Sequence, residues 1–249
     1  MHAMSNFWHT IFFDPIYNLL VYLIDIVPGG DVGVAIILVT IIVKVILLPL
    51  SLKAARTQLA MREIEPMLKE LKEKYKDKRE EYAKATMEAY KKAGVNPFSS
   101  IVLLFVQIPI IIALYLSVYK GGGVALPAIN TDLLYSFVPT PEVITMLFLG
   151  LVDIAAKNLP LALLAGGTQF IHTHLSLPKS TPKNPESAPS FKDDFARSMQ
   201  LQMRYVMPLI IFFVAYSISA TIALYFTVSN LAAIAQEYIV RKKGLKHHG

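Results

Sequence analysis

Long runs of apolar residues alternate with polar and charged segments along the chain. Four runs are obvious: Val32 to Leu52, Phe98 to Val118, Leu159 to Leu177, and a longer one from about Met199 to Val240. A helix needs ~20 predominantly apolar residues to cross the hydrocarbon core of a bilayer. The first three runs have that length, and the fourth has enough for two crossings. The pattern therefore predicts membrane-spanning helices.

A fifth apolar stretch, Leu133 to Val152, fails the same criterion. Pro139, Pro141 and Glu142 interrupt it, and Asp132 and Asp153 flank it. A clean run of ~20 apolar residues is never reached. We expect an extracytoplasmic loop that touches the membrane interface.

The first 31 residues contain no Lys or Arg, so they lack the basic start of a cleavable signal peptide. Apolar residues recur there at helical spacing, namely Ile16, Leu19, Leu20, Leu23 and Val27, and Pro28-Gly29-Gly30 follows them. This favours a short amphipathic helix that lies at the membrane interface, with Trp8 as an anchor.

Basic residues decide the topology, because short loops rich in Lys and Arg stay cytoplasmic. Residues 53–97 hold twelve of them, 178–204 hold five and the tail after Val240 holds four, whereas 119–157 hold two. All basic clusters lie on one side only if 133–152 does not cross and the last run crosses twice, turning near Ser217-Ile218-Ser219. This predicts five spans, with the N-terminus outside and the C-terminus in the cytoplasm.

The composition agrees with this interpretation. Of 249 residues, 54% are hydrophobic and 17% charged, the mean hydropathy is +0.49 and the net charge is +6. The absence of cysteine excludes disulfides, thiolate metal sites and cysteine nucleophiles.

The predicted protein is all-α and polytopic: five transmembrane helices, a cytoplasmic helical hairpin and an N-terminal interfacial helix in a single domain, 1–249. Its segments are the interfacial helix 14–28, span 1 at 32–52, the hairpin 53–97, span 2 at 98–118, an extracytoplasmic loop 119–157, span 3 at 158–177, a cytoplasmic loop 178–198, span 4 at 199–217, span 5 at 218–240 and a basic tail 241–249.

Lys44 is the main candidate for function. It follows Gly33 by eleven residues and precedes Lys53 by nine, so it lies ~13 Å or more from either end of the first span. A Lys at that depth costs roughly 2.5 to 3.5 kcal/mol on insertion scales, and its stem cannot reach the surface. Because no span has an acidic residue at comparable depth, we expect a hydrated cavity around Lys44. The alternative is a packed Lys paired with an acid or a carbonyl.

Polar residues on other spans could line this cavity. They are Thr40, Gln107, Thr168, Gln169, Tyr225, Thr227 and Asn230. Taken singly, each could instead form hydrogen bonds that hold two helices together.

Residues 53–97 combine apolar stripes at helical spacing with twelve Lys/Arg and eight Asp/Glu. The pattern predicts a cytoplasmic helical hairpin. It could be a solvated pair of helices, or a platform that contacts anionic lipid, ribosomal RNA or an incoming chain.

Enzyme signatures are missing from the sequence: no metalloprotease, phosphate-binding, serine-hydrolase or dinucleotide pattern occurs. His172 and His174, two residues apart near a helix end, point to different faces and do not predict a metal site. We expect no enzyme, no cofactor, no metal and no DNA partner.

Several motifs together resemble the YidC/Oxa/Alb family of membrane protein insertases. They are Asp14-Pro15-Ile16-Tyr17-Asn18-Leu19-Leu20, Ile42-Val43-Lys44 followed by Leu48-Pro49-Leu50, Lys92-Ala93-Gly94-Val95-Asn96-Pro97 running into Val106-Gln107-Ile108-Pro109-Ile110, and Ala223-Leu224-Tyr225-Phe226 through Val228-Ser229-Asn230-Leu231. The resemblance runs from about Asp14 to Val240.

This resemblance implies a bundle around a hydrophilic groove that is open to the cytoplasm and to lipid and closed outside. Lys44 takes the position of the basic residue that attracts acidic or polar segments of a substrate, where the family usually has Arg. Lys keeps the charge but loses the planar, multi-donor guanidinium. The implied groove residues are Lys44, Thr40, Gln107, Thr168, Gln169, Tyr225 and Asn230.

The resulting hypothesis is a membrane protein insertase and chaperone of the bacterial plasma membrane that works without nucleotide hydrolysis. Its partners would be nascent membrane proteins, the ribosome, the Sec translocon and anionic lipid. Two alternatives stay open: a small solute or anion transporter, and a basic membrane scaffold that docks a soluble partner. No inverted repeat supports the transporter, and a scaffold has no need for a basic residue inside a span.

Overall fold

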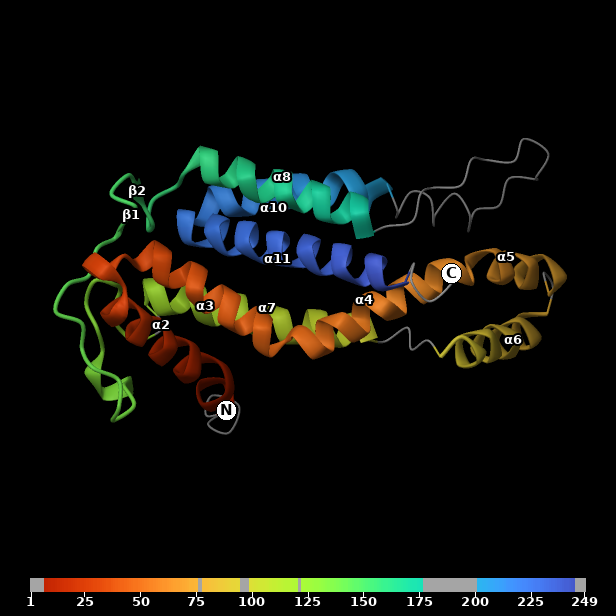
Figure 1. Ribbon diagram of the computed structural model, residues 1–249, viewed down its shortest axis with the longest axis horizontal. Helices are drawn as coiled ribbons and strands as arrows, with labels where there is room; N and C mark the ends of the chain where they lie inside the picture. Colours follow the sequence, from red (N-terminus) through yellow and green to blue (C-terminus); the bar gives the residue numbers. More distant parts are fainter. Residues whose placement is uncertain (1–6, 76–77, 95–98, 121, 177–200, 245–249) are drawn as a thin grey trace. The chain divides into compact units, whose positions relative to one another are not determined.

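The computed structural model describes residues 7–75, 78–94, 99–120, 122–176 and 201–244, and the side chains of these residues except 62, 99–104 and 241–244. The described chain is mostly helical (Figure 1). It divides into two compact units, one formed by 1–45 with 108–235 and the other by 46–107 with 236–249. The predicted cytoplasmic loop 178–198 and the end of the basic tail, 245–249, lie outside the described residues.

Within its described residues, the first unit contains six helices or parts of helices. They are α2 (Asp14–Ile26), α3 (Val32–Ile46), the second half of α7 (Ser99–Tyr119), α8 (Leu159–Ser176), α10 (Met207–Ile218) and α11 (Ala220–Gly244), with short π-helical turns η1 (His9–Phe13) and η4 (Gln202–Val206) and the 3-10 turn η2 (Pro28–Gly30). Pro208 stands at the start of α10 and cannot donate a backbone hydrogen bond, which agrees with the irregular turn η4 just before it.

Helices α8 and α10 pack closely in the first unit (Figure 1). Gly166 of α8 faces Phe212 and the carbonyl of Pro208, and a β-carbon there would come within 2.9 Å of Phe212 Cβ. Small residues at such positions let two membrane helices approach closely. Outward side chains on both helices, such as Leu163, Leu209 and Phe213, are large and apolar and are more than half exposed. An apolar outer surface of this kind is typical of contact with lipid.

Helix α11 begins directly after α10. Ser219, the residue between them, has an extended backbone, and the turn near Ser217-Ile218-Ser219 lies here. The next six residues, Ala220 to Tyr225, are all buried. The first turns of α11 are therefore surrounded by protein on every side.

The N-terminal helix α2 buries a wider face than its apolar stripe predicts. Of the predicted stripe, Ile16, Leu20, Leu23 and Val27 are buried, but so are Tyr17, Asn18, Val21 and Ile24. The helix packs against protein in the first unit, whereas an amphipathic helix on a membrane surface places its apolar face in lipid. Tyr22 and Ile26 remain exposed on the other side.

The segment between α7 and α8 contains only short elements. They are the 3-10 turn η3 (Thr131–Leu133) and the strands β1 (Leu147–Phe148) and β2 (Val152–Asp153), which pair antiparallel with Phe148 opposite Val152. The stretch 133–152 thus forms no long helix. The strands are a small addition to an otherwise helical structure.

The predicted first span, 32–52, is not one helix. Helix α3 ends at Ile46 and α4 (Leu48–Glu63) begins after a break at Leu47. Pro49 has no N–H for the carbonyl four residues earlier, and its ring disfavours helical geometry before it. By length and hydropathy, no single helix within the described residues meets the criterion for a membrane span, and only the bent pair of α3 with Leu48–Met61 meets it jointly.

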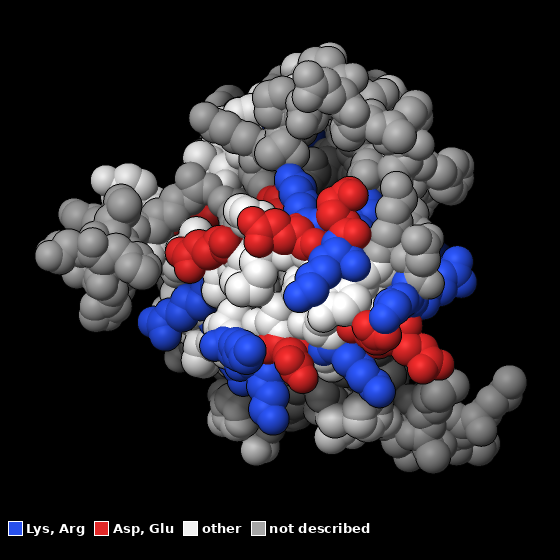
Figure 2. Space-filling model, turned by 90° about the vertical axis from the view of Figure 1, so that its right-hand side faces the viewer, with Lys and Arg blue, Asp and Glu red and all other residues white. Residues whose placement is uncertain are grey.

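The second unit contains α4, α5 (Glu65–Lys74) and α6 (Arg79–Lys92), with the first half of α7 and the end of α11. Helices α5 and α6 contact each other. Figure 2 shows basic and acidic side chains interspersed on the face that is turned to the viewer. Burial raises the pKa of Tyr90 on α6, and Tyr82 adds to the shift. Ser51 of α4 donates a 2.7 Å hydrogen bond to Gln236 Oε1 of α11.

Candidate functional site

Lys44 lies at the end of the buried face of α3. The buried residues of this helix are Val32, Gly33, Ala35, Ile36, Val39 and Thr40. Thr40 is only 2% exposed and donates a 2.7 Å hydrogen bond to the carbonyl of Ile36. Lys44 follows Thr40 by four residues, so it emerges on the same face one turn later, where it is half-buried. The residues on the other side, Ile41 and Val45, are exposed and apolar.

Asn230 and Thr168 connect two helices inside the first unit. Asn230 of α11 is 6% exposed, and its Nδ2 donates to Thr168 Oγ1 of α8 at 3.3 Å and to the carbonyl of Ala165 at 3.4 Å. Thr168 Oγ1 donates in turn to the carbonyl of Leu164 at 2.8 Å. The structure therefore brings these two predicted site residues together, 62 positions apart in the sequence.

Other predicted residues satisfy their polar groups locally. Gln169 Nε2 donates to Thr173 Oγ1 at 3.4 Å, and the Thr173 hydroxyl donates to the Gln169 carbonyl. The Thr227 hydroxyl donates to the carbonyl of Ala223 at 2.8 Å. Such bonds to the carbonyl of the preceding turn allow hydroxyls to stay in an apolar helix.

Tyr225 and Gln107 complete the predicted set. Tyr225 is 2% exposed on α11, and its ring meets that of Phe226 edge to face. Gln107 of α7 is half-buried and belongs to the second unit, whereas the other seven predicted residues belong to the first. The first unit alone thus contains Lys44, Thr40, Thr168, Gln169, Tyr225, Thr227 and Asn230.

Sequence reasoning missed two polar residues that hold the segment between α7 and α8. Asn18 of α2 is 2% exposed; its Nδ2 donates to the carbonyls of Asp14 and Leu133, both at 2.9 Å, and its Oδ1 accepts from the N–H of Tyr135 at 2.6 Å. The three bonds use both polar atoms of the carboxamide, because the nitrogen donates two of them and the oxygen accepts the third. Asn18 stands within an apolar helical stripe, and that position is the only signal the sequence gives.

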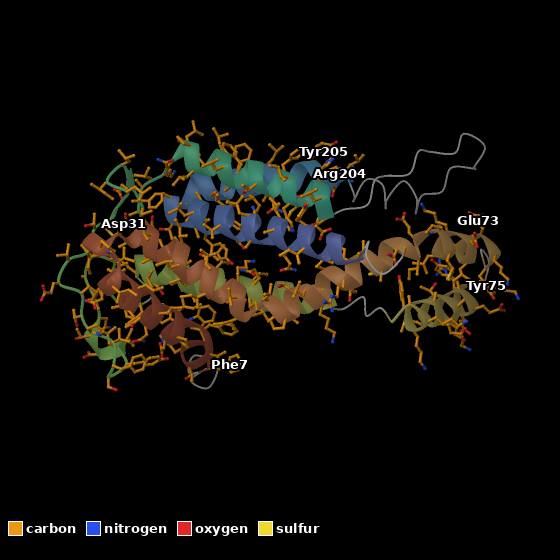
Figure 3. The ribbon with its side chains drawn as sticks, in the orientation of Figure 1. Phe7, Asp31, Glu73, Tyr75, Arg204 and Tyr205 are labelled. Carbon is orange, nitrogen blue, oxygen red and sulfur yellow. The ribbon has the colours of Figure 1, made fainter. Side chains whose placement is uncertain are left out.

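Asp31 is the second such residue. Its Oδ1 accepts from the N–H of Val34 at 3.0 Å, which caps the start of α3, while its Oδ2 accepts from the N–H of Leu149 at 2.7 Å. Figure 3 shows Asp31 at the start of α3. An acidic residue directly before an apolar run is a recognisable helix-start signal, but nothing in the sequence indicates the bond to Leu149.

Further bonds attach this segment to the same end of the first unit. The Tyr17 hydroxyl accepts from the N–H of Asn130 at 2.9 Å, and burial raises its pKa although this bond acts in the opposite direction. The Tyr119 hydroxyl donates to the carbonyl of Ala155, and Thr221 of α11 donates through its N–H and its hydroxyl to the carbonyl of Ile154. Segment 122–158 therefore bonds to α2, α3, α7 and α11; we call it the outer segment.

No group of three His, Cys, Asp or Glu side chains that could hold a metal ion occurs among the residues that the structure describes. The chemistry of the first unit is a half-buried cation and neutral hydrogen-bonding groups within apolar helices. Such an arrangement can attract and solvate polar groups inside a membrane.

The family model described as "60Kd inner membrane protein" matches residues 23–247. The protein named membrane protein insertase YidC from Oceanobacillus iheyensis is 31% identical to this chain, over 96% of this chain and 85% of its own length. The protein of the same name from Clostridium tetani is also 31% identical, over 88% of this chain and 86% of its own length. The membrane protein insertase MisCA of Bacillus subtilis is 27% identical over 97% of this chain and 82% of its own. The chain therefore belongs to the 60 kDa inner membrane protein family, the family of the YidC-type insertases.

Proposed function

We propose that the chain is an insertase of the bacterial plasma membrane, which takes nascent membrane proteins into the bilayer and helps them fold. The observation that carries this proposal is Lys44, a half-buried cation on the buried face of an apolar helix. Relatives of this chain with a similar length are named insertases. No motif in the sequence requires a cofactor for this activity.

The proposed topology has five spans, the N-terminus outside, the C-terminus in the cytoplasm and α2 at the outer interface. The distribution of basic residues supports it, since 53–97 and 178–204 hold seventeen of 24. In this topology α5 and α6 form a cytoplasmic hairpin, and the outer segment lies on the extracytoplasmic side. The mixed charges of α5 and α6 suit contact with a ribosome or with lipid headgroups (Figure 2). Ribosome, Sec translocon and anionic lipid are proposed partners on that basis.

In the proposed mechanism, the hairpin receives a hydrophobic segment, and the polar interior of the bundle receives the short hydrophilic part that must cross. Lys44 attracts acidic groups in that part, and Thr40, Thr168, Gln169, Tyr225 and Asn230 of the first unit line the path. Unsatisfied polar groups cost several kcal/mol each in hydrocarbon. Hydrogen-bonding partners along the path lower that cost, and the apolar segment then moves sideways into lipid.

The test is insertion of a small single-span protein with an acidic N-terminal tail into liposomes that contain the purified chain, scored by protease protection. Lys44→Arg should retain protection and Lys44→Ala should reduce it. Lys53→Ala, which removes the same charge from an exposed position on α4, is the matched control and should behave as wild type.

Equal protection by wild type and Lys44→Ala would refute the role of Lys44 while leaving the insertase in place. Wild-type protection no better than that of empty liposomes, for several substrates and correctly folded protein, would refute the insertase itself.

A further inference from the structure

The turn between β1 and β2 presents three leucines outward. Leu147, Leu149 and Leu151 alternate along the chain and are 47%, 64% and 84% exposed. Phe148, between the first two, faces the protein: a β-carbon on Gly33 of α3 would lie within 2.6 Å of its side chain. One side of the turn is thus packed on the start of α3 and the other is an unpartnered apolar edge.

Three backbone amides at the tip of this turn donate to acceptors within the protein. The N–H of Gly150 donates to the carbonyl of Leu147, that of Leu151 to Phe148, and that of Leu149 to Asp31 Oδ2, at 3.1, 3.0 and 2.7 Å. A segment can enter hydrocarbon only when its backbone donors are satisfied internally. The three amides at the tip of this turn meet that requirement.

Two local features are unusual for a turn that faces water. Leu149 has φ +52°, a left-handed conformation that favours glycine, yet a large apolar side chain stands there. In addition, none of the ten residues from Val143 to Val152 is charged, while Glu142 and Asp153 flank them. Exposed leucines in an uncharged turn are explained if their side chains have an apolar environment to enter.

The position of the turn identifies that environment. The N–H of Val32, the first residue of α3, donates to the carbonyl of Thr145, and the N–H of Thr145 donates to the carbonyl of Gly30, at 3.0 and 2.8 Å. The turn is therefore bonded to the residues at which α3 begins (Figure 1). For a chain embedded in a membrane, the start of a spanning helix lies at the boundary between headgroups and hydrocarbon.

We infer that the β1–β2 turn inserts Leu147, Leu149 and Leu151 into the outer leaflet of the bilayer and anchors the outer segment to lipid. This inference depends on the membrane location of the chain and on its proposed topology, and it does not depend on which proteins are inserted.

The absence of cysteine allows single-cysteine labelling without background. Leu149→Cys and Leu151→Cys would each carry a nitroxide spin label, with the protein in vesicles of phosphatidylcholine and phosphatidylglycerol. Collision rates with oxygen, which concentrates in lipid, and with a water-soluble nickel chelate give the depth of each label. Asp132→Cys, exposed in the same segment, is the aqueous control, and Leu163→Cys on the outer side of α8 is the lipid control.

We expect labels at 149 and 151 to lie roughly 5 to 10 Å below the headgroups, the depth of interfacial apolar groups, and the label at 132 to lie in water. Labels at 149 and 151 that the nickel chelate reaches as readily as the label at 132 would overturn the inference. A second result would also overturn it: labels that are shielded from the nickel chelate at high protein concentration and become accessible when the protein is diluted in lipid. In that case a second copy of the chain, and not lipid, covers the turn. The wild-type insertion assay runs separately, so failure of the lipid anchor and failure of the insertase give different results.

Discussion

Gly166 and Gly167 are neighbours in α8 but have opposite surroundings. A β-carbon on Gly166 would lie 2.9 Å from Phe212 Cβ and 3.3 Å from the carbonyl oxygen of Pro208, both on α10. A β-carbon on Gly167 would have no atom within 4 Å. The two substitutions Gly166→Ala and Gly167→Ala therefore test the contact of α8 with α10 within one helical turn.

The expected difference follows from two terms. Replacing a mid-helix glycine by alanine favours the helix by up to ~1 kcal/mol in both variants. Gly166→Ala also forces α8 away from α10, because Phe212 Cβ is fixed to the backbone and cannot rotate aside, and such overpacking costs about 1 to 3 kcal/mol. The helix term cancels in the comparison, so Gly166→Ala should be about 1 to 3 kcal/mol less stable than Gly167→Ala.

Equilibrium unfolding by sodium dodecyl sulfate in mixed micelles, followed by circular dichroism, measures this difference. Gly167→Ala should unfold at or above the wild-type midpoint and Gly166→Ala below it. Equal midpoints for the two variants would refute the close packing of α8 on α10.

Three further predictions concern the contacts of α2 and α3 with the outer segment. Asn18→Ala removes three hydrogen bonds and should lower the free energy of unfolding by about 2 to 4 kcal/mol; wild-type hydrogen exchange at the Tyr135 amide would contradict this. Because burial raises the Tyr17 pKa above its usual 10.0, the stability it contributes is complete below that pH and is lost as the pH rises through the raised value. Tyr17→Phe should reduce this loss of stability at high pH. The test is the unfolding midpoint measured from about pH 9 to about pH 12, roughly one unit below to two units above the ordinary tyrosine pKa. A pH profile equal to that of the wild type would contradict the prediction. Gly33→Ala would place a β-carbon 2.6 Å from Phe148 Cβ and should cost about 1 to 3 kcal/mol, measured by the same unfolding titration; wild-type stability would show that Phe148 can move away.

The helices could be predicted where the signal is local. Apolar runs, the basic clusters and the polar Ser217-Ile218-Ser219 between two apolar runs are all properties of neighbouring residues. The break at Leu47 was also present as a signal, because Pro49 disfavours a helix that continues through it. The predicted span 32–52 did not specify this break, and in the structure the stretch consists of α3 and the start of α4.

The candidate site was predictable in its parts and not in its contacts. Counting residues from Gly33 gives the place of Lys44 along α3, but the count on to Lys53 crosses the break at Leu47, so Lys44 lies in the last turn of α3 and its depth in a membrane stays a prediction. The bond from Asn230 to Thr168 joins positions 62 apart, and the bonds from Asn18 to Leu133 and from Asp31 to Leu149 join positions 115 and 118 apart. One sequence carries no signal for such pairs, since the bond forms only once the helices have packed.

The buried start of α11 has a consequence for the order of assembly. Ribosomes add about 5 to 20 residues per second, so roughly 3 to 13 seconds pass between synthesis of Ile154 and of its partner Thr221. During that interval the carbonyls of Ile154 and Ala156 lack the hydrogen bonds that the first residues of α11 donate in the finished protein. The buried residues Ala220 to Tyr225 have not yet been made. The packing of the outer segment can therefore be completed only after Thr221 has been made, several seconds after Ile154.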